Sequence, residues 1–301
     1  LIGGLMEHIE QAGVHSGDSS CSIPAFSLSN DIQVEIIRQM KEFTKKLNVI
    51  GLVNAQFAIR KDKIFVLEVN PRASRTVPFV SKATGLQLAK IAAKVMIGLS
   101  LEDQGCLKQI IPDFYSVKGP VFPFNKFPDT DPILGPEMKS TGEVMGTGKT
   151  FGEAYIKSQN AAGIHIPDKG KVFISVREPD KNDKLIELGQ FLANQQFEII
   201  ATTGTAEYLN DNNINCLQIN KVREGSPHIV ELIKSKDIEL IINTTEGKQS
   251  IEESFSIRAE AVISGITYYT SLEAAHATMS SFDFLGDISV NRLQDYNIKN
   301  G

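Results

Sequence analysis

The sequence predicts an α/β protein in which a mixed α+β portion is followed by a doubly wound parallel sheet. Two patterns support this fold class. Residues 53–70 alternate apolar and polar side chains around a polar turn, which is typical of an antiparallel hairpin. Beyond residue 172, short and nearly continuous apolar segments alternate with helical periodicity, which indicates parallel strands joined by helices. Residues 163–171 contain Gly and Pro and are expected to form the linker.

Length and composition limit the function classes. A chain of 301 residues suggests about two domains. A net charge of −5 without a basic cluster argues against nucleic acid as a partner. No apolar run approaches the roughly 20 residues that span a bilayer, and no secretory signal is visible, so no membrane partner is expected. Three widely spaced cysteines fit reduced thiols in a cytoplasmic protein. The apolar start at Leu1 suggests a piece of a longer protein.

Two helices are expected in the first portion. Ser29 is a plausible N-cap for a helix that runs to about Leu47 and carries one apolar stripe. A second helix is expected over residues 85–97. Residues 99–163 contain several prolines that break any long element. Within them, Glu143–Thr150 approaches a phosphate-loop pattern, but Glu143 stands where that pattern needs glycine, and no strand clearly leads into it.

The hairpin brings together side chains that suit a cation. If it is centred on Asp62, Gln56 lies opposite Glu68, with Asn70 further along the same face. The other face is expected to be core, and it carries Val53, Phe57, Ile59, Phe65, Leu67 and Val69. Carboxylate and amide oxygens suit Mg²⁺, which leans on substrate phosphates for its remaining ligands. The alternative is a half-exposed hairpin with a wet polar face.

Two arginines follow the hairpin directly. Arg72 and Arg75 carry the planar guanidinium group that binds carboxylate and phosphate oxygens in pairs. A metal-nucleotide on one side and a small oxyanion on the other would make a phosphoryl-transfer site. The alternative is an ordinary solvated pair.

Polar residues follow three strands of the predicted parallel sheet. The strands are expected at 172–176, 198–202, 216–219 and 238–243, with helices at 181–193, from Thr205 and from Ser226. The strand ends carry Thr202–Thr205, Asn220–Lys221 and Asn243–Thr245. Ligands of such sheets bind beyond the carboxyl ends of the strands, often at helix N-termini, so a phosphate pocket is expected there. The alternative is that these residues only cap helices.

Several motifs resemble one family in order along the chain. Glu68–Gly85, with the sequence EVNPRASRTVPFVSKATG, looks like the signature of the large subunit of carbamoyl phosphate synthetase, an ATP-grasp ligase. Met6–Asp18, Tyr115–Lys118, Pro123–Pro128 and Gly135–Gly146 are similar to the same family. The resemblance implies the second ATP-grasp half, which phosphorylates carbamate with MgATP for pyrimidine and arginine biosynthesis. It also implies a small glutamine amidotransferase subunit as partner, and self-association into higher oligomers.

The resemblance assigns roles in the first portion. It implies a partial ATP-grasp domain over 1–98, completed by a connecting segment over 99–163. By this resemblance, the nucleotide pocket would be lined by Gly13, Val14, His15, Ser16, Gln56 and Glu68. Gln56, Glu68 and Asn70 would hold Mg²⁺ or Mn²⁺, while Arg72 and Arg75 would steady carbamate and the transferring phosphoryl group. K⁺ is left open as a further cation.

The last portion, 164–301, resembles the methylglyoxal-synthase-like regulatory domain of the same subunit. By that likeness, a monophosphate such as UMP or IMP would be held by Lys181, Thr202, Thr205, Lys221, Asn243, Thr244 and Thr245. Some relatives also bind ornithine, and the residues that match are Glu10, Asp18, Tyr268 and Thr270. Gly119 departs from that site, where enteric members carry glutamate. Two rivals remain open: a regulatory nucleotide-binding module without catalysis, and a methylglyoxal synthase fused to a remnant.

Overall fold

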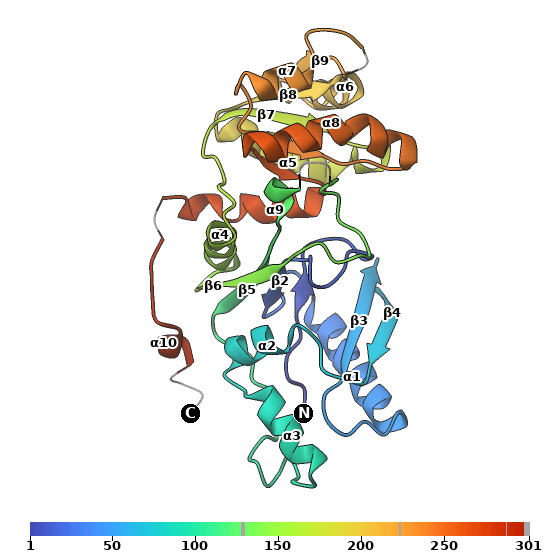
Figure 1. The fold of residues 1–301 in the computed structure, drawn as a ribbon, viewed down its shortest axis with the longest axis vertical. Coiled ribbons are helices and arrows are strands. Elements are labelled where there is room, and N and C mark those ends of the chain that lie inside the picture. The colour runs from blue at the N-terminus through green and yellow to red at the C-terminus, as the bar shows by residue number, and fades with distance from the viewer. Residues whose placement is uncertain (128–129, 223, 287, 298–301) are drawn as a thin grey trace.

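The computed structural model describes residues 1–127, 130–222, 224–286 and 288–297. The first portion forms the lower part of the molecule in Figure 1, and the parallel sheet with its helices lies above it. Helices α4 (Phe151–Ala161) and α9 (Leu272–Met279) lie between the two and contact each other.

An antiparallel sheet organises the first portion. Its strand order is β1-β2-β5-β6, with β1 at Glu7–His8, β2 at Cys21–Ile23, β5 at Tyr115–Val121 and β6 at Gly142–Gly148. The 3₁₀ turn η1 (Phe124–Lys126) follows β5. Residues from the predicted connecting segment therefore pair with strands near the chain start.

The segment that approaches a phosphate loop forms strand β6 itself as far as Gly148, so it is not a loop that follows a strand. Its glycines serve packing. A Cβ at Gly146 would lie 2.1 Å from the carbonyl oxygen of Ala154, and one at Gly148 would lie 2.7 Å from the Cβ of Glu153. Helix α4 can lie this close to the sheet only because these positions lack a side chain.

Helix α1 (Asn30–Lys46) confirms the first predicted helix, and the Ser29 hydroxyl accepts from the Ile32 N–H as expected of an N-cap. The second predicted helix is shorter than expected, as α3 (Leu88–Met96). An additional helix, α2 (Val77–Thr84), precedes it and ends at Gly85, whose φ of 76° is left-handed.

The hairpin β3 (Asn54–Arg60) and β4 (Lys63–Asn70) has the predicted pairing of Gln56 with Glu68. Its turn contains only Lys61 and Asp62, both with positive φ, and a bulge between Gln56 and Phe57 restores the expected register.

The bulge overturns part of the predicted face assignment. Phe65 pairs with Ala58 and therefore shares the face of Gln56, while Val66 lies opposite Phe57. The predicted core face is also wrong, because Ile59, Phe65 and Leu67 are 37%, 49% and 51% exposed. A two-stranded hairpin has little to cover it. Helix α1 packs beside it, with the Phe43 and Phe57 rings 6.5 Å apart.

The second portion confirms the doubly wound parallel sheet. The strand order is β11-β10-β7-β8-β9, and every pair is parallel. The strands are β7 (Gly170–Ser175), β8 (Phe197–Thr202), β9 (Leu217–Ile219), β10 (Leu240–Asn243) and β11 (Thr267–Tyr269).

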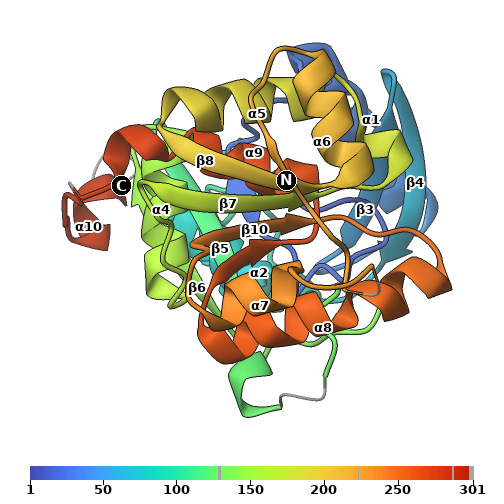
Figure 2. The same ribbon diagram turned by 90° about the horizontal axis from the view of Figure 1, so that it is seen from above.

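Helices cover both faces of this sheet (Figure 2). One face packs against α5 (Asp183–Asn194), α6 (Thr203–Asp211) and α9, and the other against α7 (Ile229–Lys234) and α8 (Lys248–Ser264). Helix α7 begins after His228 rather than at Ser226, because the Glu231 carboxylate accepts from the His228 N–H at 2.9 Å. The remaining short elements are η2 (Glu178–Asp180), η3 (Phe282–Phe284) and α10 (Leu293–Asn297).

The apolar core is continuous between the two portions. Tyr155 and Ile156 of α4 belong to the same buried cluster as Val172 and Leu272 of the parallel-sheet portion. A Cβ at Gly152 would lie 1.7 Å from the carbonyl oxygen of Ser280, so α4 and the segment after α9 are in close contact. In the described part of the chain, no helix is long and apolar enough to cross a membrane.

Candidate functional site

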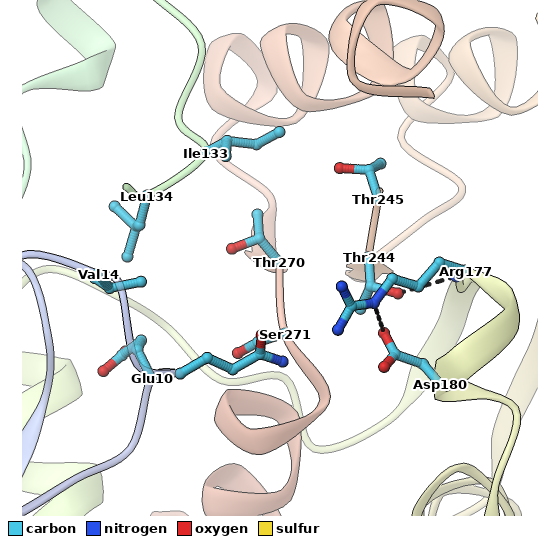
Figure 3. A pocket seen from close by; sticks show the side chains of 11 residues that line it. Glu10, Val14, Ile133, Leu134, Arg177, Asp180, Thr244, Thr245, Thr270 and Ser271 are labelled. Atoms are coloured by element: carbon cyan, nitrogen blue, oxygen red, sulfur yellow. Dashed lines mark hydrogen bonds and ion pairs between the residues drawn. The ribbon is translucent and has the colours of Figure 1, made fainter. Parts of the chain in front are cut away.

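A cavity of about 140 Å³ lies between the two portions of the chain (Figure 3). Its lining is mainly polar on the parallel-sheet side. The lining residues are Glu10, Gln11, Val14, Ile133 and Leu134 from the first portion, and Arg177, Asp180, Thr244, Thr245, Thr270 and Ser271 from the second.

The topology of the parallel sheet explains this location. Strands β7 and β10 are neighbours, but the chain runs from β7 to β8 and β9 on one side and from β10 to β11 on the other. Ligands of doubly wound sheets bind where the strand order reverses in this way, beyond the carboxyl ends of the strands. Arg177, Thr244 and Thr270 follow the ends of β7, β10 and β11 and line the cavity there.

Arg177 and Asp180 were missed by the sequence analysis. The Arg177 Nε donates to Asp180 Oδ2 at 2.8 Å, and the Arg177 backbone N–H donates to Thr244 Oγ1 at 3.1 Å. The hydrogen bond to Asp180 raises the pKa of Arg177 above its ordinary value. The sequence could have indicated both residues, because they follow strand β7 in the same way as the predicted phosphate-binding residues follow β8, β9 and β10.

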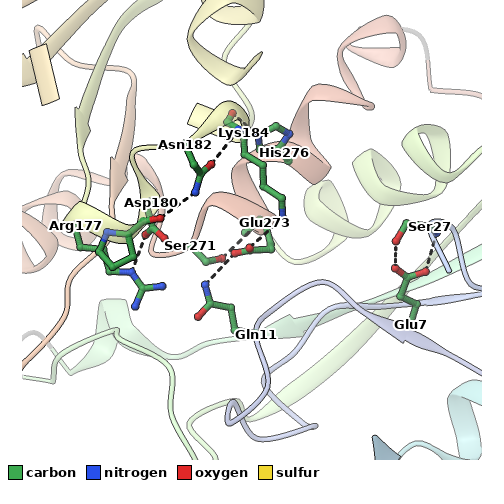
Figure 4. A network of polar contacts seen from close by, with 12 residues as sticks. Glu7, Gln11, Ser27, Arg177, Asp180, Asn182, Lys184, Ser271, Glu273 and His276 are labelled. Carbon is green, nitrogen blue, oxygen red and sulfur yellow. Dashed lines mark hydrogen bonds and ion pairs between the residues drawn. The ribbon is translucent and has the colours of Figure 1, made fainter. Parts of the chain in front are cut away.

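Polar side chains join the two portions beside the cavity (Figure 4). Gln11 Nε2 donates to Glu273 Oε2 at 3.1 Å, and Lys184 Nζ lies 3.4 Å from Glu273 Oε1. His276 Nε2 lies 2.7 Å from the Lys184 carbonyl oxygen. Separately, the Glu7 carboxylate holds the segment after β2, since it accepts from the Phe26 N–H at 2.8 Å.

The residues predicted for ornithine are divided by the structure. Glu10 and Thr270 line the cavity, whereas Asp18 and Tyr268 are not among its described lining residues. The buried Asp18 carboxylate accepts from the backbone N–H groups of Lys139 and Ser140, both at 2.8 Å.

Glu10 and Tyr268 both have shifted pKa values. Burial raises the pKa of Glu10, although hydrogen bonds from the Ser19 hydroxyl at 2.8 Å and the Ser20 N–H at 2.6 Å oppose the shift. Burial also raises the pKa of the Tyr268 hydroxyl. Within the cavity, Glu10 is therefore a carboxyl group that is harder to ionise than an exposed one.

The loop predicted to line the ATP pocket connects β1 to β2. Val14 lines the cavity between the two portions, and the His15 N–H donates to the Gly135 carbonyl oxygen at 2.8 Å. The Lys118 ammonium group is buried and donates to the carbonyl oxygens of Ser16 and Gly17, both at 3.2 Å. Lys118 therefore fixes the backbone of this loop, a role that sequence reasoning did not assign.

The residues predicted to hold a metal share one face of the hairpin. Gln56 pairs with Glu68, and Asn70 Nδ2 donates to Glu68 Oε1 at 2.8 Å. One carboxylate and two amides are oxygen donors that fit a hard cation carrying its own waters and substrate phosphates. In the described residues, no cluster of three or more His, Cys, Asp or Glu side chains suits a metal ion.

The two predicted arginines are exposed near the end of the hairpin. The Arg72 N–H donates to the Asn70 carbonyl oxygen at 2.8 Å, which keeps the arginine beside the predicted metal ligands. Arg75 Nη1 lies 2.7 Å from Met138 Sδ, so its side chain contacts the segment before β6.

Several of the residues predicted to bind a nucleotide monophosphate lie around the end of β7. Thr202 Oγ1 lies 3.2 Å from Ser175 Oγ, Thr205 Oγ1 accepts from the Val176 N–H at 3.2 Å, and Asn243 Nδ2 donates to the Ser175 carbonyl oxygen at 3.4 Å. Thr244 accepts from Arg177, and Thr245 lines the cavity.

The two predicted lysines differ in position. Lys181 Nζ pairs with Glu178 at 2.7 Å, and it lies 3.1 Å from where a Cβ on Gly204 would be, so it sits at the N-terminus of α6. A lysine and a helix N-terminus are a favourable combination for phosphate. Lys221 is exposed beyond the end of β9, and its backbone N–H donates to Glu224 at 2.8 Å.

Comparison with known proteins finds two families, which match separate parts of the chain. The family described as "Carbamoyl-phosphate synthase L chain, ATP binding domain" matches residues 2–104, and the "MGS-like domain" matches residues 184–270. The fold and these matches define a protein that joins an ATP-binding portion to a domain similar to methylglyoxal synthase.

Similarity to complete proteins extends over almost the whole chain. The carbamoyl phosphate synthase large chain of Xanthomonas campestris pv. campestris is 53% identical over 98% of this chain and 28% of its own length. Those of Pseudomonas putida and Haemophilus ducreyi are each 52% identical, over 98% and 99% of this chain and 27% and 28% of their own lengths. The chain belongs to the carbamoyl phosphate synthase large chain family and spans little more than a quarter of these relatives.

Proposed function

We propose that this chain acts as part of a carbamoyl phosphate synthase large subunit, in the step that phosphorylates carbamate for pyrimidine and arginine biosynthesis. A carbamate oxygen attacks the γ-phosphorus of ATP, the bond to the β-phosphate oxygen breaks, and carbamoyl phosphate and ADP result. The observation that carries the proposal is the pairing of Gln56 with Glu68, beside Asn70 and Arg72, in a chain 53% identical to such a large chain.

Each predicted site residue has a role in this step. Arg72 and Arg75 would hold the carbamate and the transferring phosphoryl oxygens, because guanidinium groups bind such oxygens in pairs. Gln56, Glu68 and Asn70 would hold Mg²⁺ or Mn²⁺, which neutralises charge on the phosphates when bound. Gly13, Val14, His15 and Ser16 would contact the nucleotide through a loop that Lys118 and Gly135 hold in place.

Further proposals concern the intact enzyme. Ammonia would come from a small glutamine amidotransferase subunit, and K⁺ would serve as a further cation. The intact enzyme would act in the cytoplasm and would self-associate into higher oligomers.

We assign residues 1–98 to the ATP-grasp domain, 99–163 to its completion and 164–301 to the regulatory domain. The pairing of β5 with β2, in a sheet that also contains β1 and β6, supports the second of these assignments.

Glu68→Ala in the intact enzyme tests the catalytic proposal. The assay is formation of ATP from carbamoyl phosphate and MgADP, which reports the carbamate half-reaction alone. We expect a loss of at least about 100-fold, because removal of a charged group from a phosphoryl-transfer site has effects of this order. Glu102→Ala, at another exposed glutamate, is the control and should retain the wild-type rate. A wild-type rate in Glu68→Ala would refute the site assignment.

A second proposed function is nucleotide sensing by the parallel-sheet portion. Its support is the position of Lys181 at the N-terminus of α6, close to Thr202 and Thr205. UMP or IMP would bind there through the phosphate. Ornithine would bind in the cavity between the two portions, near Glu10 and Thr270. As an isolated chain, the protein would then act as a regulatory binding module.

A further inference from the structure

A fully buried arginine joins the two portions of the chain. Arg258 of α8 is 0% exposed, and its Nε and Nη2 donate to the two carboxylate oxygens of Asp131 at 2.8 and 2.5 Å. The same guanidinium group donates to the Ile251 carbonyl oxygen at 2.8 Å and approaches Asn243 Oδ1 at 3.4 Å. Arg258 therefore contacts Asn243 of the proposed nucleotide site and Asp131 of the first portion.

The segment that carries Asp131 is tied to the loop proposed to line the ATP pocket. Lys139 Nζ donates to the carbonyl oxygens of Asp131 and Ile133, both at 2.8 Å. The backbone N–H groups of Lys139 and Ser140 donate to the Asp18 carboxylate at 2.8 Å.

A second connection runs through the middle of the same segment. The His15 N–H donates to the Gly135 carbonyl oxygen at 2.8 Å, and the Ser140 hydroxyl donates to the Gly17 carbonyl oxygen at 3.2 Å. Residues 131–140 therefore contact the loop of residues 13–18 at His15, Gly17 and Asp18. A displacement of Asp131 would be transmitted to the loop backbone, because hydrogen bonds rather than solvent connect them.

We propose that Arg258 is a coupling residue: through Asp131 and residues 131–140 it transmits occupancy of the site near Asn243 to loop 13–18, and so changes ATP affinity. This inference rests on the proposed nucleotide-sensing function and adds a route to it. A nucleotide phosphate that draws the Asn243 amide away would alter one of the contacts that hold the guanidinium group. By linkage, ATP and effector must then change each other's affinity by the same factor.

The surroundings of the pair support this role. Burial raises the pKa of Asp131, but hydrogen bonds from Arg258 and the Ile133 N–H outweigh it, and the net pKa is lowered. The carboxylate is therefore charged at neutral pH and keeps its partner. The charges of Asp131 and Arg258 also act on Tyr268 of the proposed ornithine set.

The experiment uses the intact enzyme carrying Arg258→Lys. Lysine keeps the charge but cannot bind both carboxylate oxygens in parallel. We measure the KM for MgATP in the carbamate half-reaction with and without UMP or IMP, and the effector Kd by calorimetry. Where the wild type shows an effect of about fivefold or more, the variant should show less than about twofold. Its effector Kd and its kcat without effector should stay close to the wild-type values.

Two further variants keep the test independent of folding defects at Arg258. Asp131→Asn removes the charge from the other side of the pair, and Lys139→Gln interrupts the route outside both proposed binding sites. Both should also reduce the effector response, and combining either with Arg258→Lys should reduce it no further. Lys149→Gln, an exposed lysine outside residues 131–140, is the control with an intact response.

The outcomes separate the two levels of inference. A wild type that binds neither UMP nor IMP would overturn the nucleotide-sensing function itself. A wild type that responds, together with variants that respond as strongly, would overturn only the coupling role of Arg258. Variants that lose effector binding would also overturn it, because Arg258 would then be a binding residue and not a coupling residue.

Discussion

Asp18 provides a sharp test of how the structure uses a buried carboxylate. The resemblance to the family assigns Asp18 to an ornithine site, but its two oxygens accept the backbone N–H groups of Lys139 and Ser140 at 2.8 Å. Asp18→Ala leaves both donors without their acceptor. A buried donor that loses its partner costs about 1–3 kcal/mol, so the two together should lower the free energy of unfolding by about 2–6 kcal/mol.

The assay is urea unfolding followed by far-UV circular dichroism, since the chain contains no Trp for fluorescence. Asp18→Asn retains one acceptor oxygen and should lose roughly half as much stability as Asp18→Ala. Glu102→Ala, at an exposed position, should change stability by less than about 0.5 kcal/mol. If Asp18→Ala unfolds at the wild-type urea concentration, the carboxylate does not hold residues 139–140, and the reasoning fails.

Three other predictions test separate parts of the structure. Burial lowers the pKa of His8 to about 4, so between about pH 6.5 and pH 4 the unfolded chain binds a proton that the folded chain does not bind. The free energy of unfolding should therefore fall by about 3 kcal/mol as the pH is lowered through this range. His8→Gln should abolish that part of the shift in the urea midpoint. Gly146→Ala should lower the melting temperature by several degrees, because its Cβ would overlap α4, whereas Gly135→Ala, in open space, should leave it unchanged. Lys181→Ala should weaken UMP binding by about tenfold or more, because a contact to the phosphate is lost. Lys184, which pairs with Glu273, provides the control: equal weakening in Lys184→Ala would argue against a specific contact of Lys181.

Local patterns were sufficient for the hairpin, α1, α3 and the strands and helices from β7 to β10, but they did not predict the antiparallel sheet β1-β2-β5-β6, helix α4 or the elements after β10. The apolar stripe and Ser29 predicted α1, and apolar segments with helical crossovers predicted the parallel sheet. Helix α2 was not expected in Thr76–Gly85, although Pro78 lies in its first turn, where proline is compatible with a helix. Its evidence lies in packing, because Phe79 and Val80 are buried against Ile23 and Leu88.

The hairpin shows why a correct register can still give wrong faces. The expected pairing of Gln56 with Glu68 follows from centring the turn on Asp62, and it holds in the structure. Beyond it, one extra residue in β4 exchanges the faces of Phe65 and Val66. A bulge has no clear signal in alternation, and exposure depends on what covers the hairpin.

The candidate site was predictable where residues follow strand ends, and it was not predictable where distant segments meet. Thr202, Asn243 and Thr244 follow from the topology of a parallel sheet. Arg258 sits inside a helix, and its partner Asp131 is 127 residues away, so no local pattern links them. The buried Lys118 likewise acquires its role only when β5 pairs with β2.

The most direct test of the account is calorimetric titration of UMP and IMP into this chain, with Thr202→Ala and Lys221→Ala in parallel. We expect saturable binding of one nucleotide to the wild type, and loss of that binding in both variants. If a folded wild-type chain binds neither nucleotide, the same titration of the intact large subunit decides the matter. Absence of binding there as well would contradict the proposal that the parallel-sheet portion is a nucleotide sensor.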